Sequence, residues 1–196
     1  MIETALGYQI ATVSLILFVV LGAFDGIYFH MIKYQLYKHP PARFEHLLHT
    51  FRGILFLPIT LLFFVWNSAG SLLWIGMFLL LIDFIAEIVD IMIEKEARKS
   101  LGGISSVESV IHITATGFRM AAIAIILALK PLEAYKLQYI TNDLPPLPNY
   151  LQGVGELFII GLSIALIVQV VHNIISTVIG RMHLPCCGCQ TLEQMT

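Results

Sequence analysis

Five long apolar stretches limit this chain to one kind of fold. A helix that crosses a bilayer needs about 20 mainly apolar residues. Five windows meet that length: residues 6–30, 44–66, 71–93, 104–129 and 151–179. Charged residues are 12% of the sequence, about half their share in soluble domains. The sequence therefore predicts an all-α integral membrane protein, a five-transmembrane-helix bundle that forms a single domain over residues 1–196.

The charges between these windows predict how the bundle is oriented. Lysine and arginine gather on one side of the predicted membrane, at Lys33, Lys38, Arg43, Lys95, Arg98, Lys99 and Arg181. The other side has only Lys130 and Lys136. Because positive loops stay inside, we expect the N-terminus outside and the C-terminal tail, residues 184–196, in the cytoplasm. A cell (inner) membrane is the favoured location. The net charge of −2 predicts no binding to nucleic acid.

Ionisable side chains lie near the predicted cytoplasmic ends of all five windows. At a rise of roughly 1.5 Å per residue, one set lies about 8–14 Å deep: Asp25, His49, Glu87, His112 and His172. A shallower ring contains His30, Glu45, Asp90 and Glu108, while Arg52 and Asp83 lie deeper. Five helices that bring such groups to one level predict a common site.

The spacing of these residues places most of them on single helix faces. Asp83, Glu87, Asp90 and Glu94 follow the i, i+4, i+7, i+11 pattern of one face. Asp25 and His30 do not, because five residues on a straight α-helix are about 140° apart. We therefore expect only one of these two side chains to point into the site.

The buried acids need a compensating charge. A carboxylate at the bilayer centre costs at least about 2.5 kcal/mol, and six acids in the windows face only Arg52 and Arg119. Two divalent metal ions, iron favoured over zinc or manganese, would offset this charge. The predicted metal ligands are Asp25, Glu45, His49, Asp83, Glu87, Asp90, Glu108, His112 and His172. The predicted supporting or anion-binding residues are His30, His46, Arg52, Arg119 and Gln169.

A repeated Glu/His spacing supports a dinuclear centre. Glu45 precedes His49, and Glu108 precedes His112, each by four residues. In ligand types this pattern is similar to ferritin-like di-iron bundles, where the spacing is three residues and the bundle is not transmembrane. The likeness carries no catalytic residue across. The repeat itself predicts two helix hairpins, residues 6–30 with 44–66 and 71–93 with 104–129. Glu87 is the predicted bridge between the two ions, because it lies midway between Asp83 and Asp90 on one helix face.

These features favour an oxidoreductase that acts on a lipid or another hydrophobic substrate, with a possible redox partner on the cytoplasmic side. Mixed oxygen and nitrogen ligands suit iron or manganese. Four alternatives stay open: a zinc-dependent membrane hydrolase, a metal or proton carrier, a haem-binding electron-transfer subunit, and a structural subunit with protonated acids. Cys186, Cys187 and Cys189 in the tail are candidate zinc ligands or sites of lipid attachment.

Overall fold

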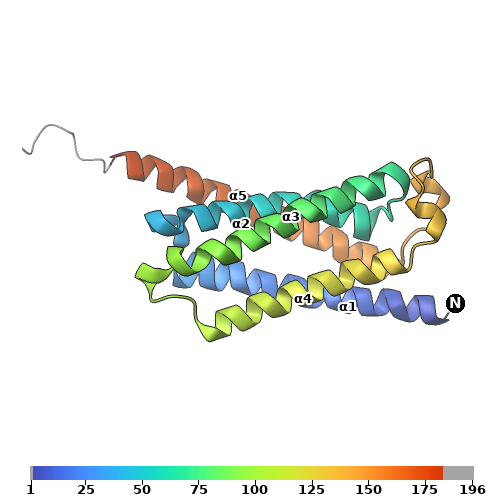
Figure 1. Cartoon of the computed structure of the whole chain (residues 1–196), viewed down its shortest axis with the longest axis horizontal. Coiled ribbons are helices and arrows are strands. Elements are labelled where there is room, and N and C mark those ends of the chain that lie inside the picture. The colour runs from blue at the N-terminus through green and yellow to red at the C-terminus, as the bar shows by residue number, and fades with distance from the viewer. Residues whose placement is uncertain (1, 183–196) are drawn as a thin grey trace, which may run out of the picture.

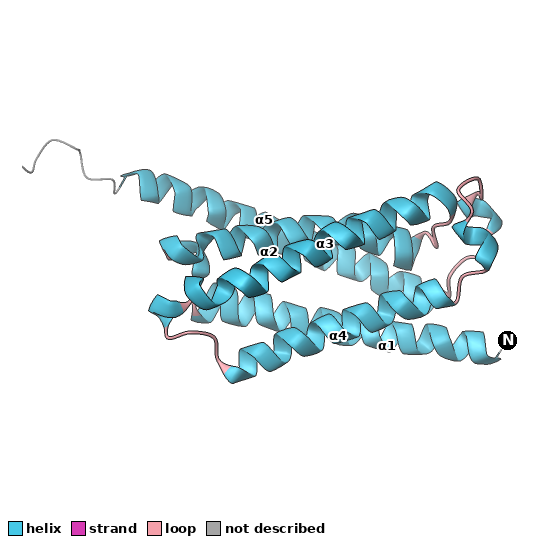
Figure 2. Cartoon of the chain, in the orientation of Figure 1, coloured by secondary structure: helices cyan, strands magenta, loops and turns pink. Residues whose placement is uncertain are grey.

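The computed structural model describes residues 2–182, most of which lie in helices (Figures 1 and 2). No β-strand occurs among these residues. The five long helices are α1 (Ile2–Phe24), α2 (Arg43–Thr60), α3 (Gly70–Ala97), α4 (Ser106–Ala128) and α5 (Asn149–Met182). The predicted all-helical fold is confirmed. The three tail cysteines lie outside the described residues.

Five helical segments are long and apolar enough to cross a membrane, as the sequence predicts. They cover Thr4–Lys33, Pro40–Val65, Gly70–Ala97, Ser106–Ala128 and Asn149–Ile175. The third segment continues to Ala97, beyond the predicted end at residue 93, because Glu94, Lys95 and Glu96 are good helix formers. The side of the membrane on which each end lies stays a prediction. We call the end formed by residues 34–42 and 98–105 the charged end; it is at the left of Figure 1.

The helices pack as two pairs in two layers, α2 against α3 and α1 against α4, with α5 against α1 and α2 (Figure 1). The predicted pairing of consecutive helices into hairpins is wrong in this respect, since α1–α2 and α3–α4 are not among the closely packed pairs of the described helices. Small residues contribute to the α1–α4 pair, since a Cβ built on Gly7 of α1 would lie 3.0 Å from the side chain of Leu129, the residue that follows α4. Ala11 and Ala122 are fully buried, and small side chains let two helix backbones approach closely.

Apolar side chains form the core away from the charged end. This core includes Leu55, Ile59 and Phe63 from the second span, packed with Leu73 and Ile126. Many large apolar side chains on the outside of the bundle are exposed, among them those along α3 and α5. An outer surface of this kind suits hydrocarbon and not water, which agrees with the predicted membrane location.

The connection between α4 and α5 folds over the end opposite the charged end. It contains two short 3₁₀ turns, Leu132–Tyr135 and Thr141–Asp143. The Trp74 indole N–H donates to the Tyr135 carbonyl oxygen at 3.0 Å. Gly70 has a φ of +57°, and a Cβ there would lie 2.1 Å from the Tyr139 carbonyl oxygen, so only glycine lets this segment pack so closely.

Two of the spans change from α-helix to π-helix along their length. The first span is π-helical at Asp25–Lys33 and the second at Leu61–Val65. The Tyr34 N–H accordingly donates to the Phe29 carbonyl oxygen five residues earlier, at 2.9 Å. π-helical turns are rare and occur frequently at functional sites. The first of these segments carries two of the predicted site residues.

Candidate metal centre

The charged half of the bundle buries an unusual number of ionisable groups. Six carboxylates are at most 6% exposed: Asp25, Glu45, Asp83, Glu87, Asp90 and Glu108. Three arginines are buried with them: Arg52, Arg98 and Arg119. Three guanidinium groups cannot neutralise six carboxylates, so up to three negative charges remain for histidines or a bound cation to balance. The arrangement divides into a deep and a shallow part.

The deep part is an arginine–carboxylate network between α2, α3 and α4. The Arg119 Nη1 lies 2.8 Å from an Asp83 oxygen, and its Nη2 pairs with Glu87. The Arg52 Nε and Nη2 lie 3.2 Å from Asp83 and Glu87, respectively. The Thr116 hydroxyl donates to Glu87 at 2.6 Å. Both acids are therefore neutralised by arginine, and Arg119 joins α3 to α4 where the two helices are not closely packed.

Asp90 lies next to this network and connects it to the histidines. Its Oδ2 is 3.6 Å from the Arg52 Nη1 and 3.1 Å from the His49 Nε2. The His49 ring also lies against the His30 ring, with centroids 4.2 Å apart. His49 is thus placed between the arginine network and the shallow part of the site.

The shallow part is organised by Arg98, a residue that the sequence analysis treated as a loop charge. Arg98 is 1% exposed. Its Nη2 donates to the Glu45 Oε1 at 2.6 Å, and its Nη1 donates to the Glu108 Oε1 at 2.7 Å. Burial alone would lower the pKa of Arg98, but hydrogen bonds and attraction from Glu45 and Glu108 raise it above its ordinary value. The signal was present, because Arg98 follows Glu94 by four residues and continues the polar face of α3.

Two groups of side chains in the shallow part have the composition and spacing to hold a metal ion. They are His30 with Glu45 and His49, and Asp25 with His30 and Glu108. In each group one donor atom per residue lies within 4.8 Å of the others. His30 belongs to both groups, although the sequence analysis gave it only a supporting role. Residue groups that can hold a metal therefore exist where the sequence predicts them.

The π-helix is what brings Asp25 and His30 together. Its hydrogen bonds join residues five apart, so His30 follows Asp25 by about one turn and both side chains are buried. The Oδ2 of Asp25 lies 3.8 Å from the Nε2 of His30. The expectation that only one of these residues points into the site is wrong, because it assumed a straight α-helix.

Several side-chain atoms in the shallow part that could bind a metal have no hydrogen-bond partner among the described residues. They are the Asp25 Oδ1, the Glu108 Oε2 and the Nε2 of His112. The other ring nitrogen of His112 lies 3.3 Å from the Asp25 Oδ2 and so orients this carboxylate. A buried acceptor that lacks a hydrogen bond costs about 1–3 kcal/mol or more. A cation bound between Asp25 and Glu108 would use the free oxygen of each.

The other predicted ligands belong to neither metal-capable group of the described residues. Asp83 and Glu87 accept hydrogen bonds from the arginines, and His112 contacts Asp25. Asp90 lies 3.6 Å from the Arg52 Nη1, and neither of its buried oxygens has a hydrogen-bond partner among the described residues. His172 stacks on Tyr37 with centroids 4.2 Å apart. His46 is fully buried, and its ring lies 6.1 Å from that of Tyr37. Whether these residues bind metal stays a prediction, as does the bridging role of Glu87.

A cavity of about 690 Å³ opens beside these residues, between α1, α2, α4 and α5. The ionisable or polar side chains on its wall are Asp25, His30, His49, Arg52, His112, Thr116, Arg119 and Gln169. The rest of the wall is almost entirely apolar and includes Phe18, Phe56 and Phe158. The cavity volume is in the range of small-molecule sites, which is roughly 300–1,000 Å³. The predicted support residues Arg52, Arg119 and Gln169 thus line a space beside the candidate centre.

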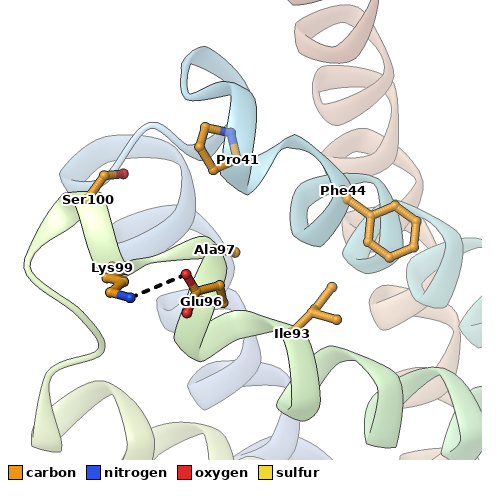
Figure 3. Close-up of a pocket in the computed structure, with 7 residues that line it drawn as sticks. All are labelled: Pro41, Phe44, Ile93, Glu96, Ala97, Lys99 and Ser100. Atoms are coloured by element: carbon orange, nitrogen blue, oxygen red, sulfur yellow. Dashed lines mark hydrogen bonds and ion pairs between the residues drawn. The ribbon is translucent and has the colours of Figure 1, made fainter.

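A second pocket, of about 410 Å³, lies at the surface of the charged end (Figure 3). Pro41 and Phe44 face Ile93 and Ala97 across it. Its only carboxylate among the lining residues, Glu96, pairs with Lys99 at 3.5 Å, and both side chains are largely exposed. Exposed pairs of this kind contribute at most about 1 kcal/mol. This pocket offers no set of metal ligands.

Comparisons of the chain with protein-family models, with curated proteins and with solved structures found no match. The function of the site must therefore be inferred from its own geometry and chemistry.

Proposed function

We propose that this chain is a membrane-embedded metalloprotein whose principal ion is held by Asp25, His30 and Glu108. One observation carries the proposal: this group combines donor atoms within 4.8 Å of one another with an unused oxygen on each acid. Two carboxylates and one imidazole are a set that iron, manganese and zinc all accept. A divalent ion there would offset most of the charge that the three arginines leave uncompensated.

The neighbouring residues would hold the ligands in position. His112 contacts the second oxygen of Asp25 at 3.3 Å. Arg98 occupies one oxygen of Glu108 and leaves the other free. Contacts of this kind orient the ligands of metal sites and tune their affinity. The ion pairs of Arg52 and Arg119 would then hold α3 and α4 in fixed positions on either side of the centre.

The group of His30, Glu45 and His49 offers a second ion position. Both oxygens of Glu45 accept hydrogen bonds from Arg98, so this position competes with a guanidinium group. It also shares His30 with the first position. Two ions per chain, as the sequence predicts, would require both ring nitrogens of His30 to bind metal. We therefore propose one tightly bound ion and a weaker second position.

We propose that the protein is an oxidoreductase that acts on a hydrophobic substrate in the cell membrane. A bound iron ion would supply oxygen-activating redox chemistry, and a zinc ion would instead supply an activated water for hydrolysis. The apolar cavity beside the centre supports a hydrophobic substrate. A redox partner would dock on the cytoplasmic side, which is the predicted location of the charged end.

The test is elemental analysis of the purified protein together with its optical spectrum. We expect close to one divalent ion per chain, with iron favoured. Zinc without iron would move the proposal to a hydrolase, and a haem spectrum would contradict the assignment of carboxylate ligands. Protein that contains no metal, and whose stability is unaffected by adding iron, manganese or zinc, would exclude a metal centre.

One observation favours a second candidate, a metal-free structural bundle. Arg52, Arg98 and Arg119 together contact Glu45, Asp83, Glu87, Asp90 and Glu108. In this alternative ion pairs would hold the charged end of the bundle together, and Asp25 would be stabilised by its contact with His112. The same elemental analysis distinguishes the two candidates, because the ion-pair bundle needs no metal.

A further inference from the structure

The cavity beside the candidate centre is long and has two chemically different parts. Its wall follows α1 and the π-helix from Ile16 to Met31, which at 1.5 Å per residue is about 22 Å if the rise were α-helical throughout. The part near the charged end has ionisable side chains, and the part toward Ile16 is lined by Val19, Val20, Leu157 and other apolar residues. An occupant that fits both parts has one polar end and one extended apolar chain.

The cavity is accessible from the outer surface of the bundle. Val20 and Leu157 line it and are nevertheless 59% and 71% exposed. They lie on α1 and α5, the two helices that border the cavity on this side. In a membrane this surface faces hydrocarbon. An occupant can therefore enter from the bilayer between α1 and α5 without passing through water.

Glycines widen the cavity where the apolar chain of the occupant would lie. A Cβ built on Gly161 of α5 or on Gly26 would meet nothing within 4 Å. At Gly22 it would meet only the ring of Phe18. All three glycines line the cavity, so its width there depends on missing side chains. Because Gly161 lines the cavity and a Cβ on it has free space, we expect a larger residue there to narrow the cavity without displacing the protein.

The charges at the polar end favour an uncharged head group. Arg52 and Arg119 line the cavity, but each already contacts Asp83 and Glu87 on α3. Asp25, also on the wall, is an acid that contacts His112. An anionic head would gain little from arginines that are already paired, and it would enter a region that stays negative even with a divalent ion bound, because six buried carboxylates face only three arginines. A cationic head would compete with the proposed ion for Asp25. A hydroxyl or carbonyl head can hydrogen-bond to His49, Thr116 or Gln169 without this cost.

We propose that the cavity binds a single-chain amphiphile with an uncharged, oxygen-bearing head, such as a long-chain alcohol, aldehyde or ketone. The chain lies between α1 and α5, and the head reaches the end that contains Asp25 and His30. The amphiphile is the substrate class of the proposed metal site, and the contacts of its head depend on the proposed function. The occupation of the cavity by the chain depends only on the apolar wall.

The test measures binding of radiolabelled hexadecanol to the full-length protein purified in detergent. Gly161→Leu should weaken binding by about tenfold or more, because its side chain fills the cavity. Gly153→Leu and Gly117→Leu are matched controls. Their Cβ atoms also meet nothing within 4 Å, neither residue lines the cavity, and leucine favours a helix more than glycine does. We expect both controls to bind hexadecanol as the wild type does.

Two competitors test the head and the chain. Palmitate, with a similar chain and an anionic head, should compete about tenfold less well than unlabelled hexadecanol. A two-chain phosphatidylcholine should not displace the label at equal concentration. Equal binding by Gly161→Leu and its controls would overturn the cavity assignment. Equal competition by palmitate would overturn the uncharged head, and displacement by phosphatidylcholine would show a site for bulk lipid only.

Metal content, measured on the same samples, separates this inference from the proposed function. Gly161→Leu should retain the wild-type metal content while losing hexadecanol. If the wild type contains no metal but binds hexadecanol in a manner that Gly161→Leu abolishes, the proposed metal centre fails and the amphiphile site stands. If the metal is present and hexadecanol does not bind, the metal centre stands and the amphiphile site is overturned.

Discussion

Arg98 and Glu45 form a buried, two-pronged ion pair at the charged end. The Arg98 Nη2 lies 2.6 Å from the Glu45 Oε1, and its Nε lies 3.0 Å from the Oε2. The pair joins the residue that follows α3 to the first turn of α2. Since the same guanidinium also contacts Glu108 on α4, one side chain holds three segments of the chain together.

Removing this arginine should destabilise the bundle and increase its response to metal. Arg98→Gln leaves Glu45 and Glu108 buried without their counter-ion, which costs about 3–5 kcal/mol for broken buried pairs. A divalent ion can then use the carboxylate oxygens that Arg98 occupied. We therefore expect a lower thermal midpoint that added manganese or zinc raises more than it does in the wild type.

The matched control for Arg98→Gln is Lys99→Gln, which removes an equal charge from an exposed neighbour whose side chain is 76% accessible. This control should change the midpoint little. An Arg98→Gln protein with wild-type stability would contradict the role assigned to the pair.

Shortening the π-helix should preserve the site. Deleting Ile27, which is 49% exposed, would place Asp25 and His30 four residues apart. Four residues on an α-helix lie on one face, so the segment can become α-helical and keep both side chains in place. We expect this deletion to retain metal and most of the stability, as measured by elemental analysis and thermal unfolding.

Deleting Val20 is the control for the Ile27 deletion, because Val20 lies in the regular part of α1. Its loss should rotate the residues on one side of it by about 100° against those on the other. Ala11 and Leu15 could then not stay buried while Asp25 keeps its direction into the site. If both deletions abolish metal binding equally, the π-helix does not absorb the extra residue as we infer.

Glu87 should act through stability and not through metal. It contacts Arg119, Arg52 and Thr116, so Glu87→Gln leaves two buried guanidinium groups short of a negative charge. We expect the free energy of unfolding to fall by about 3–5 kcal/mol, and a chelator should not change this difference from the wild type. The metal content should equal that of the wild type. Loss of the metal in Glu87→Gln would instead support the bridging role predicted from the sequence. A variant as stable as the wild type would indicate that Glu87 is protonated in the fold.

The stability of the opposite end should depend on alkaline pH through Lys130. Lys130 is 8% exposed, and its ammonium group donates to the Asn67 Oδ1 at 2.6 Å. Burial lowers the pKa of Lys130 from 10.5 to about 8. Between these two values the unfolded chain binds the proton that the folded chain has released. The free energy of unfolding should therefore rise as the pH rises from 8 to 10.5.

Thermal unfolding of the wild type and of Lys130→Met across this pH range checks the effect. The contribution of Lys130 amounts to about 3 kcal/mol at most, and methionine cannot titrate. An equal slope in both proteins would show that another group is responsible.

The sequence predicted the helices well because membrane-spanning segments have a strong signal in length and composition. All five spans and the concentration of acids and histidines near one end were found in this way. The pairing of helices was not predicted, because small residues such as Gly7, which lies close to Leu129 at the end of α4, stand out little in an apolar sequence. The shared use of His30 was missed because a π-helix changes which residues lie on one face, and residue spacing alone does not indicate one.

Arg98 illustrates a different limit. Its position after Glu94 continues the face of Asp83, Glu87 and Asp90, but a charge close to a predicted loop is normally solvated. Only the packing of α2 and α4 against the end of α3 buries it. The charge balance inferred from the sequence therefore counted two arginines where the structure buries three, and it overestimated how much charge a metal has to offset.

The most direct test of the central claim is the metal-to-protein ratio in a matched set of variants. Asp25→Asn/Glu108→Gln removes two carboxylates from the proposed ion position. Glu96→Gln/Glu133→Gln removes the same charge from two exposed positions. We expect about one divalent ion per chain in the wild type and in the exposed pair, and a large loss in the Asp25/Glu108 pair while the protein remains helical. Equal metal content in both double variants, or a wild type that binds none, would contradict a metal centre at Asp25, His30 and Glu108.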